Sequence, residues 1–130
     1  MRIKNTFGFL APVLLMAACH QAAAPHATAQ DIDTAQQEAQ REVAQARVEA
    51  AKDVKSAAKV TGSHPNEVME AKVTGSYDVA MAKADGDRKV AIARCLTLAP
   101  DTQQACRDQA EAAYQQAAAA AKSIRLARQQ

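Results

Sequence analysis

Small apolar residues recur along the chain with the period of an α-helix. From residue 31 onward they occupy Ala35, Ala39, Val43, Ala46, Ala50, Val54, Ala57 and Val60. The mean step between them is about 3.6 residues, which matches one face of a helix. The pattern therefore predicts one long helix over residues 31–62. We expect it to end at Gly62, because glycine tolerates the left-handed backbone that commonly follows a helix.

A short internal repeat follows this first predicted helix. The six letters AKVTGS at residues 58–63 recur thirteen residues later, at residues 71–76. Each copy is typical of a helix that ends at glycine and of a new helix capped by serine. Valine and threonine also favour short strands joined by a Gly-Ser turn. We expect residues 63–76 to be a linker, and the sequence leaves open whether it is helical or forms strands.

Two seams with heptad spacing predict a helical hairpin over residues 77–130. The seams are Tyr77, Met81, Ala84, Arg88, Ala91, Cys95 and Leu98, and then Cys106, Ala110, Ala113, Ala117, Ala120, Ile124 and Ala127. We expect Pro100 to halt the first arm. Asp101 is expected to cap the second arm, in a capping box with Gln104. Residues 85–87, Asp-Gly-Asp, lack the ligand spacing of a calcium loop and predict a bend in the first arm.

Cys95 and Cys106 lie on these two seams, on either side of the turn. Alanine-rich seams let helix axes approach to about 8 Å. Subtracting two Cα radii of about 2.3 Å leaves the Cα atoms within disulfide range. In an oxidising periplasm we expect this bond to form and to contribute roughly 2–3 kcal/mol. The alternatives are a redox pair, which usually has C-x-x-C spacing, and a zinc site, which needs further ligands.

The first residues have the layout of a secretory signal. Arg2 and Lys4 precede an uncharged, largely apolar run at residues 7–18. A cationic head, a short apolar segment and small residues before a cleavage point make up such a signal. The run is shorter than the roughly 20 residues that a transmembrane helix needs. Residues 1–18 are therefore predicted to be an export signal, with no part in the fold.

Two cleavage points fit this signal. Residues 15–19, LMAAC, resemble a lipobox, the motif of the bacterial lipoprotein pathway. The resemblance implies that Cys19 is lipidated and becomes the mature N-terminus, and His20 in place of aspartate implies the outer membrane. The alternative is ordinary cleavage after Ala29, at an A-x-A site. That cleavage would release a soluble periplasmic protein.

Residues 19–30 are predicted to be a flexible tether. They contain Pro25, alanine and polar residues without periodicity, and flexible-chain scaling gives a reach of roughly 20 Å. His20 and His26 lie on this segment without a neighbouring carboxylate, so we expect no metal site there. The helical body then comprises residues 31–130.

The charge balance changes once the signal is set aside. The chain has 16 Lys and Arg against 14 Asp and Glu, and Arg2 and Lys4 belong to the signal. The remainder is neutral, and its charges are mixed along the sequence. Nucleic-acid binding requires clustered, unbalanced cations, so we expect no nucleic-acid partner. Lys122, Arg125 and Arg128 suit the negative end of a helix dipole.

The composition favours long helices over a compact globular core. Alanine makes up about a quarter of the chain and is the strongest helix former. Both phenylalanines lie in the predicted signal, and large aliphatic residues are scarce. We therefore predict an all-α protein of long alanine-rich helices, with a disulfide-stapled αα-hairpin at its C-terminal end.

Five residues of the predicted hairpin carry a resemblance to a known group of proteins. They are Ala91, Cys95, Leu98, Cys106 and Ala110. Through them the chain resembles uncharacterised alanine-rich proteobacterial envelope lipoproteins with a spaced Cys pair in a helical hairpin. The resemblance implies this architecture and no particular activity.

The sequence contains no pattern that we assign to catalysis. The one histidine of the predicted body is His64, beside Pro65 in the expected linker. We expect no enzymatic activity and no cofactor. The leading hypothesis is a structural or protein-interaction lipoprotein, held by its lipid at the periplasmic face of the outer membrane, with itself or another envelope protein as partner. The alternative is a soluble periplasmic binding or stress-related protein.

Overall fold

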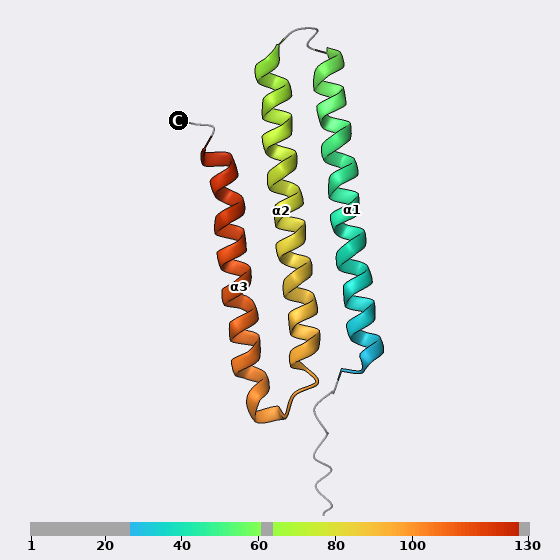
Figure 1. Ribbon diagram of the computed structural model, residues 1–130, viewed down its shortest axis with the longest axis vertical. Coiled ribbons are helices and arrows are strands. Elements are labelled where there is room, and N and C mark those ends of the chain that lie inside the picture. The colour runs from blue at the N-terminus through green and yellow to red at the C-terminus, as the bar shows by residue number, and fades with distance from the viewer. Residues whose placement is uncertain (1–26, 61–63, 128–130) are drawn as a thin grey trace, which may run out of the picture.

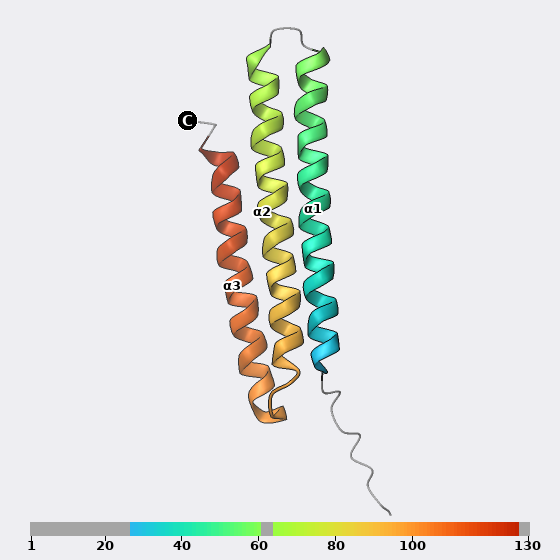
Figure 2. The ribbon, with the colours of Figure 1, turned by 45° about the vertical axis from the view of Figure 1, so that its right-hand side comes forward.

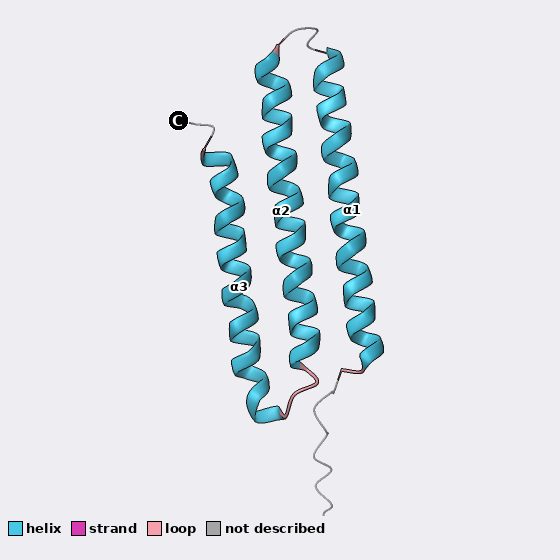
Figure 3. Cartoon of the chain, in the orientation of Figure 1, coloured by secondary structure: helices cyan, strands magenta, loops and turns pink. Residues whose placement is uncertain are grey.

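The computed structural model describes residues 27–60 and 64–127, which form three long helices (Figure 1). They are α1, Ala29–Val60; α2, Pro65–Cys95; and α3, Pro100–Leu126. Successive helices run in opposite directions, and residues 96–99 connect α2 to α3 (Figure 3). The described residues contain no strand, so the all-α prediction is confirmed. The predicted signal over residues 1–18, the lipidation candidate Cys19 and Gly62 lie outside the described residues.

The three helices form a single flat layer with α2 in the middle. α1 and α3 each pack along α2, and their described residues make no contact with each other. This side-by-side order is visible in two views (Figure 1 and Figure 2). A layer of this kind leaves both faces of α2 open and has little interior. The buried apolar side chains are accordingly small: Ala84, Cys95, Ala110, Ala118 and Ala121.

α2 continues through both glycines at which the sequence predicts an interruption. Gly75 and Gly86 are buried within the helix. An ideal Cβ on Gly75 would lie 2.5 Å from the Cβ of Ala50, and one on Gly86 would lie 2.7 Å from that of Ala39. The predicted helix break within residues 63–76, the strand alternative and the bend at Gly86 are therefore wrong for the described part. Close helix contact outweighs the helix propensity of glycine, about 1 kcal/mol poorer than alanine.

The disulfide between Cys95 and Cys106 joins α2 to α3, as the sequence predicts. The two Cα atoms are 5.6 Å apart, and Cys95, the last residue of α2, is fully buried. Next to this bond, Nε2 of the buried Gln103 donates a hydrogen bond to the carbonyl oxygen of Leu98 at 3.1 Å. Gln103 thereby satisfies a backbone acceptor in the connection, a role that the sequence analysis missed.

The start of α3 differs from the prediction. Its N-cap is Ala99, without a side-chain cap, and Pro100 occupies the first turn. The capping box expected from Asp101 and Gln104 is therefore wrong. Proline suits this position because the first amides of a helix have no intrahelical partner. Asp101 instead lies within the first turn, where a negative charge interacts favourably with the helix dipole.

A capping box is found at the start of α1. The amide of Thr28 donates to Oδ2 of Asp31 at 2.7 Å, and the amide of Asp31 donates to Oγ1 of Thr28 at 3.3 Å. The bond from the Thr28 amide, followed by that from its hydroxyl, lowers the pKa of Asp31. These reciprocal bonds satisfy free amides of the helix end. α1 therefore begins at Ala29, inside the segment predicted to be a tether.

The buried face of α3 departs from the predicted heptad positions beyond Ala110. Ala118 and Ala121 are buried, whereas the predicted positions Ala117 and Ala120 are exposed. A straight helix drifts by about 20° per heptad relative to a seven-residue repeat. Over two heptads this drift amounts to about 40°, less than the roughly 100° between successive residues, so it accounts for part of the shift.

Candidate functional site

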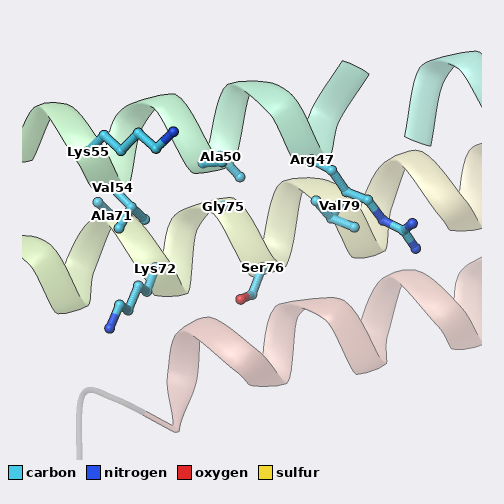
Figure 4. Close-up of a pocket in the computed structure, with 10 residues that line it drawn as sticks. Arg47, Ala50, Val54, Lys55, Ala71, Lys72, Gly75, Ser76 and Val79 are labelled. Atoms are coloured by element: carbon cyan, nitrogen blue, oxygen red, sulfur yellow. The ribbon is translucent and has the colours of Figure 1, made fainter. Parts of the chain in front are cut away.

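An open groove runs between α1 and α2 on one face of the layer (Figure 4). Its first hollow has a volume of about 720 Å³. The floor consists of small apolar residues: Ala50, Ala51, Val54, Ala71, Gly75 and Val79. In Figure 4, Arg47 reaches from α1 toward Val79 of α2, while Lys72 and Ser76 of α2 point away from α1. The hollow is thus an apolar floor with a polar rim.

Two further hollows continue this groove toward the other end of α1. One, of about 360 Å³, shares Arg47 with the first hollow. The next, of about 480 Å³, shares Ala39, Gln40 and Asp87 with its neighbour. On α1 the lining runs from residue 36 to residue 55, which is about 29 Å at 1.5 Å per residue. The groove is therefore long, and small side chains keep it open.

The rim of the groove is strongly basic. Among the described residues that line the three hollows, five are cations: Arg47, Lys55, Lys72, Lys83 and Arg94. The same lining contains one carboxylate, Asp87, and it pairs with Lys83 at 2.6 Å. Arg47, Lys55 and Lys72 are exposed and make no ion pair within residues 27–60 and 64–127. These three cations remain available to a partner.

A chain of ion pairs links all three helices. Lys89 of α2 contacts Glu42 of α1 at 2.7 Å and Asp85 at 2.9 Å. Arg88 contacts the same Asp85 at 2.9 Å and Glu111 of α3 at 3.4 Å. Single pairs at this degree of exposure contribute little to stability, whereas a network contributes more. The network therefore helps to hold the three helices in one register.

Helical geometry places this network on the face opposite the basic groove. Glu42 and Arg47 are five residues apart on α1, which corresponds to about 140° around the helix. Asp85 and Lys72 are thirteen residues apart on α2, which again corresponds to about 140°. One face of the α1–α2 pair thus carries free cations, and the other carries the carboxylates of the network.

The network changes the proton affinity of its members. Hydrogen bonds from Lys89 and then Arg88 lower the pKa of Asp85. Hydrogen bonds to Glu42 and then Asp85 raise the pKa of Lys89. The pKa of Arg88 is raised chiefly by its hydrogen bond to Asp85. All three shifts favour the charged forms of Asp85, Arg88 and Lys89.

Two cation–aromatic contacts reinforce the packing of α3 on α2. The guanidinium of Arg88 lies 4.8 Å from the ring centre of Tyr114, and that of Arg125 lies 4.3 Å from the ring centre of Tyr77. A guanidinium over an aromatic face is attracted by the ring quadrupole. Arg88, which interrupts the predicted apolar seam, is therefore part of the interface that the seam forms.

The predicted site residues have different outcomes. Cys95 and Cys106 are brought together, whereas the lipidation candidate Cys19 and the tether residues His20 and His26 lie outside the described part. His64 is the exposed residue that precedes α2. The basic groove is not apparent from the sequence, because which cations line it depends on the face at which α1 meets α2. Along the chain, the same cations alternate with carboxylates.

Within residues 27–60 and 64–127, no helix combines the length and the apolar character that crossing a membrane requires. Comparison with known protein families, curated proteins and solved structures gave no match. A functional assignment for this chain therefore rests on its own residues and their geometry.

Proposed function

We propose that this chain is a non-catalytic, lipid-anchored protein of the bacterial cell envelope that acts by packing its helices against a partner. The observation that carries the proposal is the open α1–α2 groove, with an apolar floor and three cations that have no described ion-pair partner. Apolar surface with polar groups at its edge is typical of protein-interaction sites.

The start of α1 supports lipidation at Cys19 over cleavage after Ala29. Cleavage after Ala29 would remove Thr28, the residue that caps the helix through Asp31. It would also place the positive α-amino group of Gln30 at the positive end of the helix dipole. Cleavage before Cys19 leaves the cap intact and a short segment between the lipid and the fold.

The fold suits a body that is tethered at one end. The amide of Ala27 donates to the carbonyl oxygen of Leu96 at 3.4 Å, so α1 begins beside the α2–α3 connection. The first hollow begins at Arg47, about 27 Å from Ala29 along α1 at 1.5 Å per residue. The first hollow therefore lies away from the end at which an anchor before α1 would attach. An anchor there would leave this hollow accessible to a periplasmic partner.

The anchor is tested by the intact mass of the protein from bacterial membranes, measured before and after reduction. We expect a start at Cys19 with added acyl mass, and a gain of one hydrogen per bridged sulfur on reduction. A start at Gln30 without lipid would overturn the anchor and favour a free periplasmic protein.

The interaction is tested by photo-crosslinking in intact cells. A crosslinking amino acid is placed in turn at Ala51 in the groove, Gln45 on the opposite side of α1 and Ala119 on α3, all of them exposed positions. We expect a discrete adduct at one or more positions. Absence of an adduct at every position, together with a concentration-independent monomer in ultracentrifugation, would contradict a packing function.

A further inference from the structure

We infer that the α1–α2 groove binds an amphipathic α-helix of another protein, with small or aliphatic residues along one stripe and Asp or Glu on its flanks. The inference rests on the proposed interaction function and specifies its partner. It follows from three properties of the groove: its shape, its charge and its place in the fold.

The shape of the groove fits a helix better than a small molecule. Small-molecule sites enclose most of the surface of their ligand, whereas this groove is open along one side of two helices. Its length of about 29 Å corresponds to a helix of about 20 residues. A floor of alanine, glycine and valine lets a third helix approach closely. Binding of an apolar helix face in a groove is a common mode of recognition.

The charge of the groove selects an acidic partner. Arg47 and Lys55 line it from α1, and Lys72 lines it from α2. Carboxylates on both flanks of a bound helix would therefore meet cations on both sides. The one carboxylate of the lining, Asp87, is already paired with Lys83. A basic partner would bring like charges together without compensation.

The same charges argue against a second copy of this chain in a symmetric arrangement. A two-fold dimer pairs one patch with its own copy, so that Arg47, Lys55 and Lys72 of both copies would face each other. A flat anionic bilayer is a poorer fit, because it cannot fill a concave groove. The occupant that satisfies shape and charge together is an acidic helix from a different chain.

The direct test is binding of a synthetic helix to the mature chain carrying C19S. The probe peptide has about 20 residues, with alanine and leucine along one stripe and glutamate on both flanks. The control peptide has lysine in place of glutamate. We expect the acidic peptide to bind, with an affinity that falls as salt rises, and the basic peptide not to bind. Equal binding of both peptides would overturn the inference.

Matched variants locate the site. R47Q/K55Q/K72Q removes three cations of the groove, and R41Q/K52Q/K59Q removes three exposed cations of α1 that do not line it. We expect the first variant to bind the acidic peptide about tenfold more weakly, because three exposed ion pairs are lost. The second variant should bind the acidic peptide with an affinity within about twofold of the parent chain, because salt screens charges that lie far from the bound peptide. Equal weakening by both variants would show a diffuse charge effect and refute the groove.

A steric pair tests the same site without changing charge. A51W fills the exposed floor of the groove, whereas A112W places the same side chain on an exposed position of α3. We expect A51W to abolish peptide binding and A112W to leave it unchanged. Both positions are exposed, so helical circular dichroism should show that both variants fold.

Three other outcomes would each reject the acidic-helix partner. Self-association of the chain that R47Q/K55Q/K72Q abolishes would make the occupant a second copy. Binding to phosphatidylglycerol vesicles that R47Q/K55Q/K72Q also abolishes, without binding of the peptide, would make the occupant a lipid surface. If the peptide fails to bind while crosslinks still form at Gln45, the groove is not the binding site. The proposed packing against a partner would then involve another face of the chain.

Discussion

Gly75 of α2 lies so close to Ala50 of α1 that a Cβ on the glycine would be 2.5 Å from the alanine Cβ. The same relationship recurs between Gly86 and Ala39, at 2.7 Å. Each pair is eleven residues from the other on both helices, close to the roughly 10.8 residues of three helical turns. Two contacts on one straight face therefore set the distance and the register between α1 and α2.

Replacing Gly75 by alanine tests this contact. We expect G75A to lower the free energy of unfolding by up to about 2 kcal/mol, since overpacking costs about 1–3 kcal/mol and better helix propensity returns about 1 kcal/mol. The added methyl group would also lie 3.1 Å from the Cα of Ala50, which leaves little room for adjustment. Urea unfolding followed by circular dichroism measures the effect.

The double variant G75A/A50G is the matched control, because it moves the methyl group from one helix to the other. We expect it to be more stable than the sum of the two single changes predicts. If the single variant G75A were more stable than the parent chain, the two helices would not touch at this point.

Removing the disulfide should weaken the attachment of α3. In a C19S background, C95A/C106A opens a loop with a sequence separation of 11 residues, for which chain entropy predicts a loss of about 3 kcal/mol. We expect faster amide exchange in α3 than in α1, because α1 packs on α2 without touching described residues of α3. Urea unfolding and hydrogen exchange measure the two effects. Equal loss of protection in all three helices would indicate a single cooperative unit.

The ion-pair network predicts a loss of stability in acid. The hydrogen bonds from Lys89 and Arg88 lower the pKa of Asp85 below its ordinary 3.8. A carboxylate of this kind stabilises the fold above its unfolded pKa, and that contribution is lost as the pH falls through the lower folded value. We expect D85N to be less stable than the parent chain at pH 7. Below about pH 4 we expect the free energy of unfolding of D85N to fall less than that of the parent chain.

This pH dependence is measured by urea unfolding at a series of pH values. D78N is the control, since Asp78 is exposed on the same helix and makes no ion pair within the described residues. Identical acid profiles for D85N and the parent chain would rule out a contribution of Asp85 to the network.

The capping box at the start of α1 predicts a local effect. T28A removes the hydroxyl that bonds to Asp31, whereas T28S retains it. We expect several-fold faster exchange of the amides in the first turn of α1 in T28A, with T28S close to the parent chain. Hydrogen exchange resolved by residue measures this. Unchanged exchange in T28A would mean that these amides do not depend on the cap.

Helix content, the hairpin and the disulfide could be predicted from the sequence because each depends on local or near-local signals. Alanine content and a period of about 3.6 residues specify helices. The prediction that Pro100 halts the first arm is wrong, since α2 already ends at Cys95 and Pro100 begins α3. Cys95 and Cys106 lie on arms that a short turn must bring together. These signals need no knowledge of which distant residues will be neighbours.

The role of the glycines could not be predicted in this way. By local rules Gly75, followed by serine, ends one helix and starts another, and Gly86 between two aspartates indicates a bend. In the fold both residues face α1, where the lack of a side chain becomes the condition for close packing. Long-range contact with Ala50 and Ala39 thus reverses what local preference indicates.

What the sequence determined by itself is a helical, disulfide-joined chain with balanced charge. What only the tertiary structure decided is where those charges lie. Residues that alternate in sign along the chain are sorted by the rotation of each helix, so that Arg47 and Lys72 line a groove while Glu42 and Asp85 lie on the opposite face. The physical reason is that an electrostatic surface depends on distances in space, and those are set by the contact between α1 and α2.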